Sequence, residues 1–155
     1  MTYIQALIDN CHLALGASPV HQFVIDDFVN QDLAQLDGIK TAIYRIEQLE
    51  GDPEKTFLDM SEFKKRGDRK CPKLNAPSPI LYVGSSTTGL RKRIEQHIGN
   101  KHKDTYALHL AHWFDNRCRL TVYQYDLPIA VIQIIEDAMS HNGQPAFGKT
   151  GGNNK

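Results

Sequence analysis

Long hydrophobic runs are missing from this 155-residue sequence. No stretch approaches the roughly 20 apolar residues that a membrane-spanning helix requires. The opening residues, MTYIQALIDN, have no basic segment ahead of the apolar ones, so they do not resemble a secretion signal. We therefore expect no membrane partner and a cytoplasmic location.

Cysteine is also scarce, and its pattern excludes two kinds of site. Cys11, Cys71 and Cys118 are odd in number and contain no C-x-x-C pair. A disulfide framework needs paired cysteines, and a thiolate zinc site needs closely spaced ones. The cysteine pattern thus indicates a protein of a reducing compartment.

Net charge is zero, but the charges are unevenly distributed along the chain. Residues 1–62 carry a balance of −8, whereas residues 63–103 carry +9. A strongly basic segment indicates a polyanionic partner that meets one face of the protein. With 41% hydrophobic and 23% charged residues, the chain otherwise has the composition of one globular domain spanning 1–155.

The basic segment contains the most informative stretch, from Pro79 to Gly99. Residues 80–83, ILYV, form a short apolar run that predicts a buried strand. Residues 84–89 are small and polar, as in a tight loop. Apolar residues then recur every four positions across 90–98, which predicts an amphipathic helix, and Gly99 is placed to end it.

Three side chains of this stretch suit a phosphate. Arg93 and His97 stand four residues apart and share one face of the predicted helix, while Tyr82 lies in the predicted strand. Strand, loop and helix would bring a phenol, backbone N–H groups, a guanidinium and an imidazole to one place. The residues after Gly89 argue against a nucleoside-triphosphate site of the P-loop kind, because that motif requires Lys and then Ser or Thr where Leu and Arg follow here.

The same stretch resembles the second motif of the GIY-YIG nuclease family. Residues 82–84, Tyr-Val-Gly, stand where the family has Tyr-Ile-Gly, and the following helix carries Arg93 and His97 at the family's Arg and His positions. Upstream, residues 42–44, Ala-Ile-Tyr, match the first motif, Gly-Ile-Tyr, with Ala in place of Gly. Glycine is demanded only by a positive φ or a close approach, so this departure is mild if the strand is ordinary there.

The resemblance implies an α/β (α+β) fold with a small, mainly antiparallel three-stranded central sheet flanked by helices. The strands would come from residues 38–46, 80–83 and 120–125, which are β-prone. Tyr44 and Tyr82 would then lie on neighbouring antiparallel strands and converge on the scissile phosphate.

The resemblance also implies a metal ligand. Residues 129–139, IAVIQIIEDAM, predict a largely buried helix, where a carboxylate is costly unless it is paired or binds a cation. Glu136 matches the family's late-helix Glu, the single protein ligand of the catalytic ion, and Mg²⁺ or Mn²⁺ suits such a site. The family's pattern ends in an Asn near the position of Gly148. We assign that role to Asn153, with its neighbour and Asn142 as alternatives.

The remaining segments are predicted to be scaffold and DNA contact. Residues 1–37 are expected to form a helical N-terminal extension that offers a dimerisation surface, with one helix over 3–15 and a second from Ser18 onward. A basic insertion at 47–78 is expected to hold a further helix, and so are residues 106–114. The cations expected to contact the DNA backbone are Lys64, Lys65, Arg66, Arg69, Lys70, Lys73, Arg91 and Lys92.

Taken as a whole, the resemblance implies a metal-dependent endonuclease that hydrolyses DNA phosphodiester bonds. The insertion places it closest to the restriction enzymes of the family. The residues implied to carry catalysis are Tyr44, Tyr82, Arg93, His97, Glu136 and Asn153. Either tyrosine could orient or deprotonate the attacking water, but a phenol with its usual pKa of about 10 is a poor base, so the site would have to lower that pKa.

Two alternatives stay open at this level. A protein on the same fold could bind DNA or RNA without cutting it, and the glycine-bounded loop at 84–89 could serve a smaller phosphate ligand. A homodimer that cuts both strands is the simplest restriction-like assembly.

Overall fold

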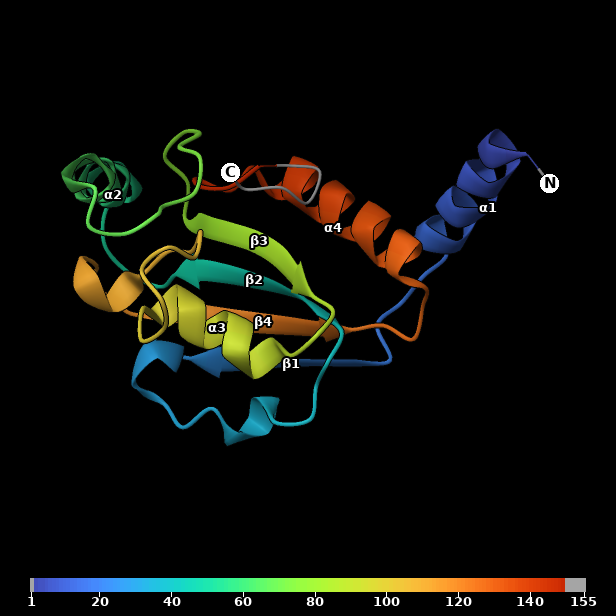
Figure 1. Cartoon of the computed structure of the whole chain (residues 1–155), viewed down its shortest axis with the longest axis horizontal. Coiled ribbons are helices and arrows are strands. Elements are labelled where there is room, and N and C mark those ends of the chain that lie inside the picture. The colour runs from blue at the N-terminus through green and yellow to red at the C-terminus, as the bar shows by residue number, and fades with distance from the viewer. Residues whose placement is uncertain (1, 150–155) are drawn as a thin grey trace.

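The computed structural model describes residues 2–149 as a mixed α+β domain around a four-stranded antiparallel sheet (Figure 1). The strands are β1 (His21–Asp26), β2 (Ala42–Gln48), β3 (Ile80–Ser86) and β4 (Cys118–Gln124). The helices are α1 (Tyr3–Leu15), α2 (Pro53–Arg66), α3 (Leu90–Ile98) and α4 (Ile129–Gly143). Three short 3-10 turns are η1 (Phe28–Asn30), η2 (Ala34–Leu36) and η3 (Leu110–His112).

The strand order across the sheet is β1-β4-β2-β3, and every neighbouring pair is antiparallel. Successive side chains of β2 point to opposite faces, and they enter two different cores. Tyr44 belongs to a large core that includes Met60 of α2 and Ile94 of α3. Ile43 belongs to a smaller core with Val131 of α4. Helices α3 and α4 therefore cover opposite faces of the sheet.

Several helix boundaries follow local signals in the sequence. The side chain of Asp52 caps α2 by accepting a hydrogen bond from the backbone N–H of Glu54 at 3.0 Å. Gly67 and Gly99 end α2 and α3 in the left-handed conformation, with φ of 71° and 108°. Within residues 2–149, no helix combines the length and the apolar character that crossing a membrane would require.

The prediction of three strands and a wholly helical N-terminal extension is wrong. Residues 21–26 form the edge strand β1, which pairs with β4, whereas a second helix was expected there. Phe23, Val24 and Ile25 are β-prone, but Phe23, Val24 and Phe28 also fit one side of a helix. Only pairing with β4, distant in sequence, resolves that ambiguity. Phe28 is fully buried as expected, although it lies in η1 and not in a helix.

The helix predicted over residues 106–114 is also wrong. Only Leu110–His112 form a 3-10 turn, because His109 adopts a left-handed conformation with φ of 52° that an α-helix does not accommodate. The Nε2 atom of His109 hydrogen-bonds to backbone carbonyl oxygens at 3.0 Å, and Nε2 of His112 does so with the Gly99 carbonyl at 2.8 Å. Both histidines are thus hydrogen-bonded within the protein.

The C-terminal segment covers the outer edge of β3. The backbone N–H groups of Ala146 and Phe147 donate to the carbonyls of Ile80 and Leu81 at 2.8 and 3.1 Å. On its other side, Phe147 forms an antiparallel bridge with Leu74 of the insertion. The insertion, the end of the chain and β3 are thereby tied together next to the residues described below.

Candidate active site

A cavity of about 180 Å³ opens where β2, β3, α3 and α4 approach one another. Its walls are polar or small and consist of Tyr44, Tyr82, Gly84, Ser85, Arg93, Gln133 and Glu136. Four of these residues, Tyr44, Tyr82, Arg93 and Glu136, are candidates named from the sequence. The structure brings all four to one place, although they come from four different elements.

Arg93 links the two tyrosines. Its Nε donates to Tyr44 Oη at 3.1 Å, and its Nη2 donates to Tyr82 Oη at 3.2 Å. The two phenol rings are stacked with centroids 6.1 Å apart and planes 12° apart. Nη1 of the same guanidinium donates to Gln96 Oε1 at 2.8 Å. Arg93 is therefore held in a single orientation by three neighbours.

Gly84 makes room for this arrangement. It lies opposite Tyr44 in the β2–β3 ladder. A Cβ atom at this position would lie 2.6 Å from Tyr44 Oη and 2.7 Å from Tyr82 Cε1. Close approach of the tyrosines thus requires glycine here. Ala42, where the family has glycine, is fully buried in β2 and is not among the residues with positive φ, so its side chain causes no conflict.

His97 also contacts Tyr44, and its tautomer follows from its partners. Its Nδ1 accepts a hydrogen bond from the backbone N–H of Leu108 at 3.2 Å, so Nδ1 carries no proton. Burial and, to a smaller extent, Arg93 hold the pKa of His97 well below its usual value, so the ring is neutral. The single proton therefore lies on Nε2, which donates to Tyr44 Oη at 2.8 Å.

Tyr44 Oη consequently accepts two hydrogen bonds, one from Arg93 and one from His97. A phenol oxygen has two lone pairs, so the hydrogen of Tyr44 is not directed at either donor and can be donated to a third group. Burial raises the pKa of Tyr44 and of Tyr82, and Arg93 only partly opposes this rise. The expectation that the site lowers a tyrosine pKa is therefore wrong for the protein by itself, and both residues are neutral phenols.

Glu136 lines the same cavity as Arg93. Its Oε2 accepts hydrogen bonds from Ser85 Oγ at 3.2 Å and from Gln133 Nε2 at 2.9 Å. In the part of the chain that the structure describes, Oε1 of the same carboxylate has no hydrogen-bond partner. Burial raises the pKa of Glu136, and the bonds from Ser85 and Gln133 counteract part of that rise.

Glu136 is the residue that would hold a divalent cation. Mg²⁺ binds through one or two carboxylates and completes its shell with water and phosphate oxygens. A carboxylate with one free oxygen in a polar cavity fits this requirement. Among residues 2–149, no three His, Cys, Asp or Glu side chains gather closely enough to bind a metal ion by themselves. Water and substrate would have to supply the other ligands.

Two residues of the cavity were not predicted. Gln133 stands three positions before Glu136 on α4, so the two share a helix face, and this spacing could have identified it. Its Nε2 also donates to Asp137 Oδ1 at 2.9 Å. Ser85 follows the Tyr-Val-Gly motif directly, but a serine in a loop-like stretch carries no distinctive signal. Both residues orient the carboxylate of Glu136.

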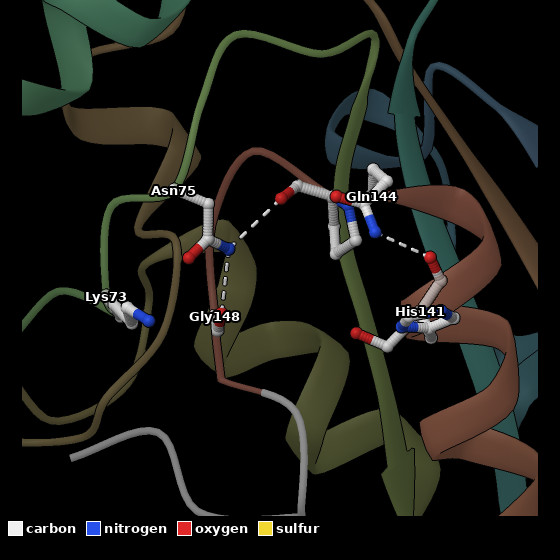
Figure 2. A pocket seen from close by; sticks show the side chains of 7 residues that line it. Lys73, Asn75, His141, Gln144 and Gly148 are labelled. Carbon is white, nitrogen blue, oxygen red and sulfur yellow. Dashed lines mark hydrogen bonds between the residues drawn. The ribbon is translucent and has the colours of Figure 1, made fainter.

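The expected asparagine is not among the described residues, because Asn153 lies outside them. The alternative, Asn142, is exposed and lines a separate pocket. Figure 2 shows instead how Asn75 holds the segment that leads toward Asn153. Its Nδ2 donates to the carbonyls of Pro145 and Gly148 at 3.1 and 2.9 Å. The insertion thereby anchors the last described residues of the chain.

The cations expected to contact DNA differ in the contacts that they make within the protein. Three of them bond to other residues: Lys64 to the Pro72 carbonyl at 2.9 Å, Arg69 to the Lys101 carbonyl at 3.0 Å, and Arg91 to Asp37 Oδ1 at 2.7 Å. Two lie over aromatic rings: Arg66 over Phe63 and Lys70 over Tyr106, at 5.1 and 5.6 Å from the ring centroids.

The other three cations lie at the surface. Lys65 and Lys73 of the insertion are exposed. Lys92 is exposed as well and lines a cleft formed with residues 85–89, which shares Ser85 and Arg93 with the cavity. Positive charge therefore continues from the cavity along the start of α3.

Comparisons with known protein families, with curated proteins and with solved structures found no match to this chain. The resemblance to GIY-YIG nucleases thus rests on the motif residues of the sequence alone.

Proposed function

We propose that this protein is a metal-dependent endonuclease of the GIY-YIG kind that hydrolyses phosphodiester bonds in DNA. The observation that supports this proposal is one cavity lined both by Arg93, which is bonded to Tyr44 and Tyr82, and by Glu136. A fixed guanidinium and two phenols suit the oxygens of a phosphate, and the carboxylate suits the cation that accompanies it.

Each of these residues has a separate role in the proposed reaction. Arg93 neutralises the charge that develops on the phosphoryl oxygens. Tyr44 lines the cavity, and its O–H group orients the attacking water. Glu136 holds Mg²⁺ or Mn²⁺, and such an ion, when bound, polarises the phosphate and stabilises the leaving oxygen.

To remove a proton from the attacking water, Tyr44 would have to act as a base. Its phenolate must form before it can accept a proton, and burial opposes that step. The hydrogen bonds from Arg93 Nε and His97 Nε2 stabilise a phenolate more than a phenol, because both donate to the oxygen that gains the charge. His97 is thus a positioning residue for Tyr44.

The test is incubation of supercoiled plasmid with the pure protein, with Mg²⁺, with Mn²⁺ and with a chelator. We expect nicking or linear product that requires the metal, and discrete bands if the cleavage is restriction-like. Arg93→Ala and Glu136→Ala should abolish cleavage, and Glu136→Ala should still bind DNA. Arg117→Ala is the matched control, since Arg117 is exposed and pairs with Glu50.

One observation favours a second candidate, a nucleic-acid-binding protein that does not cut. Burial raises the pKa of Tyr44 and Tyr82, so neither is ready to act as a base. This candidate predicts intact plasmid under every condition together with a salt-sensitive gel shift of DNA or RNA. Undiminished cleavage by Glu136→Ala would reject the proposed metal ligand.

A further inference from the structure

The N-terminal helix α1 turns its most apolar side toward solvent. Tyr3, Ile4, Leu7, Ile8 and Leu15 are 78, 67, 42, 45 and 87% exposed. We call these five residues the α1 stripe. Within Tyr3–Leu15, no residue is buried. A helix normally places its apolar residues against the core, so this orientation needs an explanation.

A different side of α1 attaches the helix to the rest of the protein. Ala14 packs against the core that α4 forms with the sheet, and Ala6 and Asn10 are half-buried at the i, i+4 and i+8 spacing of the same side. Figure 1 shows α1 at the outer end of α4, away from the sheet. Small and polar residues thus make the internal contact, and the α1 stripe stays outside.

The area of the α1 stripe approaches that of a protein interface. A large side chain presents on the order of 200 Å², so the exposed parts of these five residues amount to roughly 600 Å² in each copy. Single chains seldom expose contiguous apolar patches larger than a few hundred Å². A specific interface of standard size buries about 800 Å² on each partner, so the stripe supplies most of what a dimer needs.

We propose that the α1 stripe pairs with the α1 stripe of a second copy, antiparallel and across a two-fold axis. The stripe contains no charged residue, so two copies can meet without burying like charges, as a self-complementary interface requires. The helix is 13 residues long, about 20 Å, so its midpoint lies at residue 9. Ile8 would therefore lie close to Ile8 of the partner subunit. This inference does not rest on the proposed nuclease activity.

Cys11 offers a direct test with the natural protein. It is exposed and lies two residues from the midpoint, whereas Cys71 and Cys118 are buried. In the proposed pair, the two Cys11 residues would be separated by about 6 Å along the axis. A short bismaleimide should therefore give a cross-linked dimer, and Cys11→Ser should lose it. A dimer in solution that Cys11 fails to cross-link would overturn the antiparallel α1 pairing.

Charge substitutions at Ile8 test whether a second copy of this chain, and not another partner, covers the α1 stripe. We expect sedimentation velocity to show a dimer for the unmodified protein, and monomers for Ile8→Glu and for Ile8→Lys because like charges then face each other. Mixing the two variants should restore the dimer. Leu58→Glu is the control, because Leu58 is an equally apolar residue on α2 that is 62% exposed.

Circular dichroism and thermal melting will show that both Ile8 variants remain folded, as the exposure of this side chain leads us to expect. If the unmodified protein stays monomeric up to about 100 μM, the proposal is overturned, and the α1 stripe would have to bind a protein of another sequence. Dimers that survive Ile8→Glu would overturn it as well, because they would use another surface.

Discussion

Polar side chains are buried or half-buried and hydrogen-bonded to one another in the cavity, but mostly exposed to solvent in the basic insertion. In the cavity, Arg93, Tyr44 and His97 are oriented by hydrogen bonds to one another within buried surroundings. In the insertion, Lys65 and Lys73 lie at the surface, where their side chains keep their conformational freedom. The first region is organised for chemistry at one point, and the second for adaptable attraction over a wide surface. Substitutions in the cavity should therefore affect cleavage, whereas substitutions in the insertion should affect DNA binding.

A large effect is expected in the cavity, at Gly84, where one substitution disturbs both tyrosines. Gly84→Ala forces Tyr44 Oη and the Tyr82 ring to move, because the new Cβ would lie within 3 Å of both. We expect the free energy of unfolding to fall by about 1–3 kcal/mol and cleavage to fall at least ~100-fold, since small displacements of reacting groups are this costly. Plasmid cleavage and thermal melting measure the two effects.

Gly16→Ala is the matched control for this substitution. Its φ is −89°, and a Cβ there would meet only the His12 carbonyl at 3.7 Å. Its cleavage should equal that of the unmodified protein. If Gly84→Ala cuts equally well, cleavage does not depend on the placement of Tyr44, and the contrast between the two regions disappears.

The second effect distinguishes the two tyrosines. Tyr44→Phe leaves the donors of Arg93 and His97 without their acceptor in a buried place, which we expect to cost about 1–3 kcal/mol of stability. Cleavage should fall ~10²–10⁴-fold, as for loss of a group that handles a proton. Tyr82→Phe removes the hydrogen bond from Arg93 Nη2 but leaves both bonds to Tyr44 in place, so it should reduce cleavage less. A larger loss in Tyr82→Phe would transfer the water-orienting role to Tyr82.

The sequence predicted the centre of the fold better than its periphery. Strands β2 and β3, helix α3 and their tyrosines were predictable because a motif combines local periodicity with residue types that chemistry demands. The replacement of the motif glycine by Ala42 was expected to be mild if the strand is ordinary there, and Ala42 does lie in a strand without a positive φ. The assembly of Tyr44, Arg93 and Glu136 followed from the family resemblance and could not have come from spacing in the chain.

The incorrect predictions share one physical cause: contacts between distant parts of the chain override weak local preferences. Residues 21–26 became strand β1 through pairing with β4, and His109 stopped a helix through its left-handed backbone. Burial, which no local pattern reports, raised the pKa of Tyr44 instead of lowering it. The outward direction of the α1 stripe was hidden for the same reason: periodicity identifies an apolar side but not what covers it.

A smaller effect concerns the neutral state of His97. Its pKa is lowered in the folded protein, while in the unfolded chain it is about 6.5. Below pH 6.5 the unfolded chain binds the extra proton, so stability falls with falling pH by at most about 1.4 kcal/mol per pH unit. His97→Gln can keep both hydrogen bonds but cannot titrate. Its melting temperature should therefore fall less steeply between pH 6.5 and 5; parallel curves would show that His97 is charged in the folded protein.

The smallest effects lie in the insertion, where two lysines should separate binding from stability. Lys64 donates to the Pro72 carbonyl, so Lys64→Ala should lower the free energy of unfolding by about 0.5–1.5 kcal/mol. Lys73 is exposed on the wall of the pocket in Figure 2, so Lys73→Ala should leave stability unchanged. If Lys73 meets a phosphate, this substitution should reduce the salt dependence of DNA binding by about one ion. If Lys73→Ala keeps the salt dependence of the unmodified protein, Lys73 contacts no phosphate, and the DNA contact has to come from other cations.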